Sequence, residues 1–433
     1  MIQFFNHASF LVASKKTKLI CDPYLYGTAF NEGWDLIAQE KLNNIKDFNF
    51  IWFSHEHPDH FSIPFLKSIP EKRRNNITVL YQETYDKKVL NFCKNLGFKT
   101  YELSDHTEFE LCEDFKIKIG KFPLYDSWVL FTVEGKKILN TNDCIFKSSE
   151  SLKLVKNHVG KCDVLFAQFS YAGWIDSKEN CESRLKCARD QLRNIQIQAE
   201  EFKPSYIVPF ASFVYFCHEE NNYMNSEINT PRATIDFIER ECVGAPILLR
   251  PNEVWDGKSF KNNSSSLEYW ERKYSEIENR KPNKSGRSIS FEELVHKSKN
   301  AINRVKQKNN YLILLLFQFF GLINPVIFHL TDQNKKISFD WERGLILYKG
   351  DLPQTTISLH SESLAFMFDY DFGQDTLKVN ARFESTIQGK KELTRLFSVF
   401  SLNNTGRFIS LTGMARLLSF EIFQRAFRVF LKK

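Results

Sequence analysis

The sequence contains one short run of side chains that is typical of a metal site, SHEHPDH at residues 54–60, directly after the apolar stretch FNFIWF. An extended turn at the end of a strand can direct His55 and His57 at one metal. Asp59 and His60 then face a second metal close by. Imidazole and carboxylate ligands suit zinc, iron or manganese. The alternative is a chance surface cluster, which the small number of histidines, ten in 433 residues, disfavours.

Two metals need further ligands, and three downstream residues are candidates. Asp143 follows the apolar strand KKILNTN and is well placed as a bridging carboxylate. His218 follows another apolar run, YIVPFASFVYFC, and Asp126 in LYDSW opens the strand before Asp143. Each of these would be an ordinary turn or core residue on its own. Their order after the HxHxDH motif makes them predicted metal ligands.

Other residues are candidates for supporting or substrate-binding roles. Asp22, at a strand end, could hold a ligand imidazole by its second nitrogen. His7 could contact substrate and join Asp59 and Asp143 in catalysis; a buried histidine satisfied by the backbone is the alternative. Trp34 and Tyr215 could line a substrate pocket, although aromatic residues are more often core. Arg232 could bind an anionic substrate.

A dinuclear site of this kind can run two classes of reaction. A metal pair roughly 3.5–4 Å apart acidifies bound water, so the first expectation is a hydrolase that directs a metal-bound hydroxide at a small anionic ester, amide or phosphoester. The alternative is a di-iron oxygenase, because Asp126 adds an anionic ligand that stabilises oxidised iron. A non-catalytic metal-dependent binding protein is the third reading. The expected cofactors are two divalent metal ions, zinc or iron.

The HxHxDH motif resembles the signature of the metallo-β-lactamase superfamily, which implies a four-layer αββα sandwich with metals at one edge of the sheets. The chain is more similar still to the metallo-β-lactamase-like domain of CMP-N-acetylneuraminate hydroxylases. This likeness rests on FNHASFLV, ICDPYLYGTAFNEGW, KKILNTNDC and PFASFVYFCHEENNYMNSEINT, and it covers roughly residues 1–255. It implies a nucleotide-sugar-like substrate. Those hydroxylases carry a Rieske iron–sulfur domain, and its Cys-x-His ligand pairs do not occur here. An oxygenase would therefore need electrons from a separate protein.

The hydropathy pattern predicts two domains. Residues 1–257 alternate short strands with amphipathic helices, as in an α/β domain. Residues 258–299 are hydrophilic and predict a polar linker. Residues 300–433 predict a smaller α+β domain, weakly similar to sterol-carrier-like domains, with TLKVNARF (376–383) as one strand and a basic C-terminal helix. The apolar segment 311–330 is interrupted by Gln318, Asn324 and Pro325, so a buried helix ending near Gly321 is favoured over a membrane span.

Charge and cysteines divide the chain in the same way. The net charge is +7, and all of this excess lies in residues 301–433. All nine cysteines fall between Cys21 and Cys242, singly among apolar residues, which predicts buried thiols in a reducing cytoplasm. The basic C-terminus could contact an anionic membrane surface, and the second domain could offer a homodimer surface. The partner expected at the active site is a small-molecule substrate, and no nucleic acid is expected.

Overall fold

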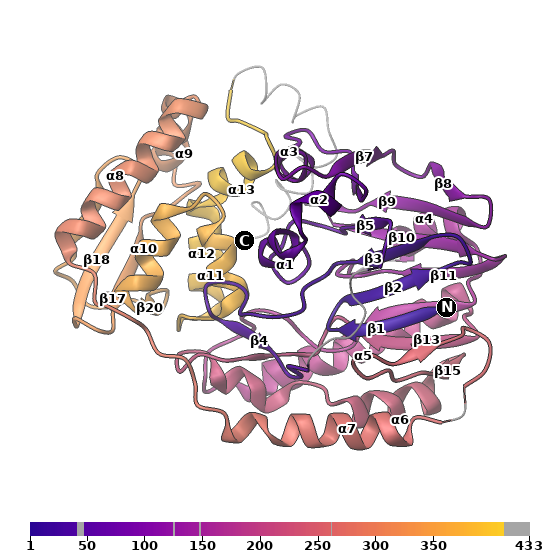
Figure 1. Cartoon of the computed structure of the whole chain (residues 1–433). Coiled ribbons are helices and arrows are strands. Elements are labelled where there is room, and N and C mark those ends of the chain that lie inside the picture. The colour runs from indigo at the N-terminus through magenta and orange to yellow at the C-terminus, as the bar shows by residue number, and fades with distance from the viewer. Residues whose placement is uncertain (41–46, 124–125, 147–148, 261, 411–433) are drawn as a thin grey trace. The chain divides into compact units, whose positions relative to one another are not determined.

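The computed structural model describes the chain except for residues 41–46, 124–125, 147–148, 261 and 411–433 (Figure 1). It divides into two compact units. Unit 1 contains residues 1–172, 182–217 and 225–281, and unit 2 contains residues 173–181, 218–224 and 282–433. Two short segments of the N-terminal half therefore fold with the C-terminal half of the chain.

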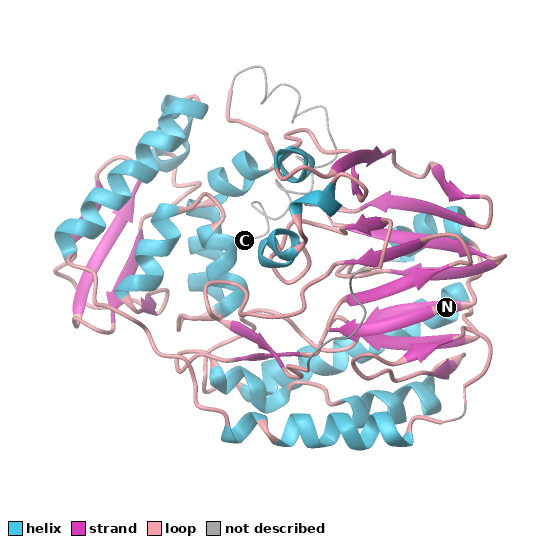
Figure 2. Cartoon of the chain, viewed as in Figure 1, coloured by secondary structure: helices cyan, strands magenta, loops and turns pink. Residues whose placement is uncertain are grey.

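Unit 1 is built on two seven-stranded sheets (Figure 2). The first sheet has the order β16-β1-β2-β3-β5-β6-β7, formed by Val254–Trp255, Ile2–Asn6, Ser9–Ala13, Lys18–Cys21, Phe50–Trp52, Thr78–Gln82 and Lys99–Leu103. The second sheet has the order β15-β13-β12-β11-β10-β9-β8, formed by Ala245–Pro246, Tyr206–Phe210, Val164–Gln168, Lys136–Asn140, Ser127–Val133, Phe115–Lys121 and Glu108–Cys112.

Aromatic side chains fill the space between the two sheets. Phe10 of the first sheet stacks on Phe166 of the second with ring centroids 4.2 Å apart, and Phe131 and Phe210 meet Phe10 edge-on. Offset and edge-on contacts of this kind are the favoured geometries of aromatic pairs. β2 is buried along its whole length, as expected for a strand covered on both faces, whereas the edge strands β7 and β8 alternate with exposed positions.

Helices cover the outer faces of the sheets. A separate apolar cluster joins the first sheet to α1 (Ile63–Ser68) and α3 (Lys88–Asn95), near the short α2 (Glu71–Arg74). The larger core cluster extends to four helices: α4 (Ser149–Val159), α5 (Cys181–Phe202), α6 (Pro231–Glu241) and α7 (Ser264–Ser275). Helix–sheet–sheet–helix layering of unit 1 agrees with the predicted αββα sandwich.

Parallel strands place the polar turns of unit 1 at a common edge. β3 and β5 are parallel, with Cys21 opposite Trp52, so Asp22 and Ser54 leave the sheet side by side. In the second sheet β11 is parallel to β12 and β12 to β13, and Asp143 follows β11. The carboxyl ends of parallel strands are where α/β folds gather their functional side chains. A two-stranded ribbon of β4 (Trp34–Leu36) and β14 (Val214–Phe216) is also part of unit 1.

Unit 2 contains a four-stranded sheet of order β19-β18-β17-β20. Its strands are Gly344–Leu347, Lys335–Asp340, Val326–Leu330 and Ile357–Leu359. Its helices are α8 (Phe291–Lys308), α9 (Tyr311–Phe319), α10 (Ser361–Asp369), α11 (Gly373–Asn380), α12 (Ile387–Leu396) and α13 (Ser398–Asn404). Trp174, from one of the two short segments, donates its backbone N–H to Lys378 O at 2.8 Å and stacks on Phe383.

The structure differs from the sequence-based expectation in two places. The stretch 258–299, expected as a polar linker, contains α7, whose Leu267 and Trp270 are buried in the core of unit 1. The TLKVNARF stretch was predicted as a strand, but its first five residues end α11. No helix in the described part of the chain is long and apolar enough to cross a membrane, and the segment at 311–330 begins with the nine-residue α9. The expected basic C-terminal helix lies outside the described residues.

Candidate metal centre

Seven side chains predicted as metal ligands or catalytic residues meet at the edge of unit 1, and we call them the His–Asp cluster. Its members are His7, His55, His57, Asp59, His60, Asp126 and Asp143. Within it, two groups can each hold one metal ion: His55, His57 and Asp143 in one, and His7, Asp59 and His60 in the other. In each group, one ligand atom from every member lies within 4.8 Å of the others. Each group therefore offers two imidazoles and one carboxylate.

Asp143 connects the two groups. Its Oδ2 lies 3.7 Å from His55 Nε2, and its Oδ1 lies 3.6 Å from His60 Nε2. His55 Nε2 and His57 Nδ1 lie 2.9 Å apart, so both nitrogens face the same space. Asp126 lies in neither group: its Oδ1 is 3.9 Å from Nδ1 of His55, on the other ring nitrogen. Asp126 is thus a neighbour of the first group in this structure.

Several buried polar atoms of the cluster have no hydrogen-bond partner, namely His60 Nε2, Asp59 Oδ1 and Asp143 Oδ1. A buried polar atom without a partner costs roughly 1–3 kcal/mol, more when charged. A cation between these atoms would satisfy all three. The donor set, imidazole nitrogen and carboxylate oxygen, is the one that zinc and iron take in proteins. The residues present fit a pair of such ions.

The charges of the cluster also favour a cation. Burial lowers the pKa of His60, but Asp59, Asp143 and Asp22 more than offset this and raise it to about 10. Burial raises the pKa of Asp59, which His60 and His7 lower to about 2, and burial raises the pKa of Asp143 to about 6. A protonated His60 therefore compensates the carboxylates, and a metal ion would displace that proton. Burial holds the pKa of His55 well below its usual value, so its imidazole is neutral and ready to bind.

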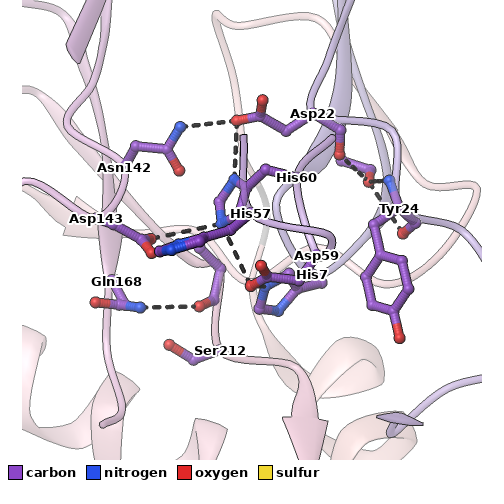
Figure 3. Close-up of polar contacts among 12 residues, drawn as sticks. His7, Asp22, Tyr24, His57, Asp59, His60, Asn142, Asp143, Gln168 and Ser212 are labelled. Atoms are coloured by element: carbon purple, nitrogen blue, oxygen red, sulfur yellow. Dashed lines mark hydrogen bonds and ion pairs between the residues drawn. The ribbon is translucent and has the colours of Figure 1, made fainter. Parts of the chain in front are cut away.

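Asp22 and Ser54 contact the predicted ligands His60 and His55 at Nδ1 of each ring. Asp22 Oδ2 lies 3.1 Å from His60 Nδ1 and accepts a hydrogen bond from Asn142 Nδ2 at 2.7 Å (Figure 3). Asp22 Oδ1 accepts the backbone N–H of Ser54, whose hydroxyl lies 2.9 Å from His55 Nδ1. Such contacts fix the orientation of metal-binding imidazoles. Neither Ser54 nor Asn142 was among the predicted site residues, although each directly precedes a predicted ligand, His55 and Asp143 respectively.

The backbone around the cluster is strained. His7, Asp22, Asn142 and Ala211 all have a left-handed backbone, with φ of 40°, 38°, 48° and 52°. Each such non-glycine residue costs on the order of 1 kcal/mol, and such residues gather at functional sites. The Ala211 N–H donates to His7 O at 2.9 Å, which joins two of these strained residues directly.

The candidate substrate residues are distributed unequally. Trp34 and Tyr215 line a small cavity of about 10 Å³ together with His7, Ser170 and Ser212. Arg232, in contrast, lies in the first turn of α6, about half exposed, and its Nε pairs with Glu271 Oε1 at 2.7 Å. Thr230 caps the start of α6, so the predicted anion-binding arginine is a surface residue of the helix. The structure does not bring it to the His–Asp cluster.

His218 belongs to unit 2 and is in neither ligand group found among the described residues. It lies in a charged cluster that we call the Arg382 cluster, formed by His218, Glu220, Ser285 and Arg382. Glu220 Oε2 accepts from Arg382 Nε at 2.8 Å and lies 3.3 Å from His218 Nδ1. Arg382 is almost fully buried, and its Nη2 donates to Ser285 Oγ at 3.0 Å.

Comparison with known proteins agrees with this architecture. Residues 1–152 match the model of the Beta-lactamase superfamily domain, in agreement with the superfamily that the HxHxDH motif resembles. A curated relative is the cytidine monophosphate-N-acetylneuraminic acid hydroxylase of Danio rerio, 23% identical over 292 residues, covering 61% of this chain and 47% of that protein. The chain spans about half the length of the curated relatives it matches.

Two solved structures are also similar to this chain. CmlA, a diiron beta-hydroxylase from Streptomyces venezuelae, has a TM-score of 0.43 and 12% identity, covering 58% of this chain and 52% of that one. An isothiocyanate hydrolase from Delia radicum gut bacteria has a TM-score of 0.42 and 13% identity, covering 58% of this chain and 97% of that one. A likeness of this size supports no conclusion about activity, and the two proteins are named for different reactions.

Proposed function

We propose that this protein is a dinuclear metal enzyme whose catalytic centre is the His–Asp cluster of unit 1. The observation that carries the proposal is the composition of the two ligand groups, each with two histidines and one aspartate. Asp143 reaches toward both groups, at 3.7 Å from His55 and 3.6 Å from His60. A carboxylate in that position can hold two ions at the short separation that dinuclear enzymes use, roughly 3.5–4 Å.

The reaction that we propose is oxygenation of a small molecule at two irons. Two histidines and one carboxylate with open positions are the donor set typical of non-haem iron oxygenases. The curated relatives are named hydroxylases, which supports the same class. Iron supplies dioxygen activation when bound, and the electrons would come from a separate protein. A nucleotide sugar or a similar small molecule is the substrate class that the relatives suggest.

The chain's own residues have three tasks in this proposal. Asp22 and Ser54 orient His60 and His55 through their second ring nitrogens, at 3.1 and 2.9 Å. Asp126, with a pKa that burial and then Asp143 raise well above its usual value, lies beside His55 and can hold a proton there. Trp34 and Tyr215 line the wall of the cavity next to His7 and exclude water from that side.

Hydrolysis is the second candidate, and the sequence alone favoured it. Two histidines and a carboxylate also form catalytic zinc sites that activate water. The position of Asp143 between the two groups suits a zinc pair equally well. In this case the same residues bind the metals, and the substrate is a small ester, amide or phosphoester. The free thiols of the described chain fit a reducing compartment, so we propose a cytoplasmic location for either reaction.

The metal that the protein binds separates the two reactions. The protein is purified under anoxic and oxic conditions, and its iron, zinc and manganese contents and visible absorption are measured. Oxygenation predicts two irons per chain and an absorption band that appears on exposure to air, with dioxygen consumed when substrate and an electron donor are added. Two zincs with turnover of an ester, amide or phosphoester, and no dioxygen uptake, would contradict oxygenation and support hydrolysis. A chain that takes up no metal contradicts both.

A further inference from the structure

We propose that His7 binds the second metal of the centre, together with Asp59 and His60, and that His218 is not a ligand. This inference rests on the proposed dinuclear centre and specifies how its second site is completed. The late histidine of the sequence, His218, was expected to take this role from its position after an apolar run. The structure instead brings a histidine from the first β-turn of the chain, between β1 and β2, to the second site.

The distances in the second group match those around a single ion. His7 Nε2 lies 3.3 Å from Asp59 Oδ2, and His60 Nε2 lies 3.5 Å from the same oxygen. Ligand atoms bonded to one tetrahedral ion at about 2.1 Å lie about 3.4 Å from each other. All three side chains are buried, at 2%, 3% and 0% exposure for His7, Asp59 and His60. The three donors therefore already surround a space of the right size.

His7 is held in this place by a strained backbone conformation. Its φ of 40° is left-handed, which an ordinary side chain rarely adopts. The His7 N–H donates to Asn6 Oδ1 at 3.0 Å, and Asn6 Nδ2 donates to Ala38 O at 2.6 Å. His7 O accepts from the backbone N–H of Ala211, a second left-handed residue, which follows β13 in the other sheet. A turn that served only to connect two strands would need none of these contacts, since an asparagine or glycine would relieve the strain.

His218 has neighbours that disfavour a metal ion. Its Nδ1 accepts the backbone N–H of Glu220 at 3.2 Å, and Glu220 is already paired with the buried Arg382. Arg382 acts on His218 as a nearby positive charge. A second cation placed beside a buried guanidinium would be repelled, because the low-dielectric interior screens charges poorly. In the His–Asp cluster, by contrast, the charged neighbours of His7 include Asp59 and Asp22.

Cobalt(II) is the probe that tests this assignment, because a thiolate ligand adds a strong near-ultraviolet charge-transfer band to its spectrum. The full chain is prepared with His7→Cys and, as the matched control, with His218→Cys, and each is titrated with cobalt chloride under anoxic conditions. We expect two cobalt ions per chain in both variants and the thiolate band with His7→Cys alone. The band with His218→Cys, or its absence in a folded His7→Cys protein that binds two cobalts, would overturn the inference.

Metal stoichiometry gives a second measurement that does not depend on the cysteine variants folding. His7→Gln, of similar size, is expected to reduce bound cobalt from two ions to one, whereas His7→Asp keeps a ligand atom and retains both. His218→Gln is expected to retain both ions. Circular dichroism shows whether each variant is folded. Two ions in folded His7→Gln at wild-type affinity would overturn the inference while leaving the dinuclear centre intact. A wild-type chain without metal would overturn the proposed function and this inference with it.

Discussion

The His–Asp cluster of unit 1 and the Arg382 cluster of unit 2 are both buried and both combine histidine with acidic side chains, but they balance charge differently. In the Arg382 cluster the cation is part of the chain, since Arg382 pairs with Glu220 at 2.8 Å. The His–Asp cluster contains three carboxylates, no arginine or lysine, and buried donor and acceptor atoms without partners. The Arg382 cluster thus contains its own cation, although His218 Nε2 is also buried without a hydrogen-bond partner, whereas the carboxylates of the His–Asp cluster favour a cation from outside. Histidine and acid content alone therefore does not identify a metal site.

The largest effect is expected from removing the residue that joins both ligand groups. Asp143→Ala takes away the carboxylate that reaches His55 and His60, so both sites lose a ligand. Substitution of a residue that contacts a ligand but not the metal typically lowers metal affinity by roughly 10–100-fold. We expect a larger fall in metal affinity for Asp143→Ala, and a loss of turnover with it. Calorimetric metal titration measures the change. Asp190→Ala, at an exposed pair with Lys186 on α5, is the control and should bind metal normally. Unchanged metal binding in Asp143→Ala would contradict the account.

A large effect on stability, without an effect on metal, is expected in the other cluster. Arg382→Met removes the buried guanidinium that pairs with the partly buried Glu220, which costs at most about 3–5 kcal/mol. Denaturant unfolding followed by circular dichroism measures the loss, and metal bound per folded chain should stay at the wild-type level. Arg232→Met breaks an exposed pair with Glu271 and should leave the unfolding midpoint close to that of wild type. Equal costs for the two variants would mean that the Arg382 pair is not a buried structural element.

A smaller effect is expected from the pH dependence of the Arg382 cluster, which is opposite in sense to that of a histidine whose pKa is raised by carboxylates, such as His60. Burial, and then the Arg382 guanidinium, lower the pKa of His218 from 6.5 to about 4; Lys284 and His360 also act on it. The unfolded chain takes up a proton below pH 6.5 and the folded chain does not. Stability is therefore full above pH 6.5 and falls by no more than about 3 kcal/mol as the pH drops to 4.

The comparison of wild type with His218→Gln isolates this effect from the titration of other groups. Denaturant midpoints are measured between pH 8 and pH 4 in the absence of metal. The variant should lose less stability on acidification than wild type does. Parallel pH profiles of the two proteins would show that His218 is not buried in its neutral form.

The smallest effect is expected at Asp22, which contacts the ligand His60 only at Nδ1, the ring nitrogen that is not directed at the metal. Asp22→Asn keeps the size of the side chain but removes the charge that faces His60 Nδ1 at 3.1 Å and weakens the contact with Asn142. Metal affinity should fall by roughly 10–100-fold with the fold retained. Isothermal titration with cobalt or zinc measures it. An affinity equal to that of wild type would show that Asp22 does not orient His60.

Much of the centre could be predicted because its ligands are close in sequence or lie at strand ends. The HxHxDH run follows β5, and Asp143 follows β11. The apolar pattern of the strands and the position of these residues after them were therefore enough to predict that they form one site. His7 was predicted to contact substrate and take part in catalysis, and not to bind a metal. Its role depends on a strained turn whose φ cannot be read from the residue type, because left-handed histidine is uncommon.

The rest could not be predicted because it depends on which part of the chain packs with which. His218 follows an apolar run like the other candidates, but residues 218–224 fold with unit 2. Residues 376–383 alternate in polarity like a strand, yet the first five belong to α11, because burial in unit 2 outweighs local strand preference. Arg232 follows a polar loop in sequence, but Thr230 begins a helix there. The first two outcomes are decided by tertiary contacts, whereas the third follows from a local helix start, with Thr230 as the cap and Pro231 after it.

Anomalous diffraction from crystals of the iron-loaded full chain tests the central claim most directly. Data collected on both sides of the iron absorption edge locate each iron without reference to the sequence. The account predicts two peaks in the His–Asp cluster, one at His55, His57 and Asp143 and one at His7, Asp59 and His60. The absence of peaks there, or a peak at His218 in the Arg382 cluster, would contradict it.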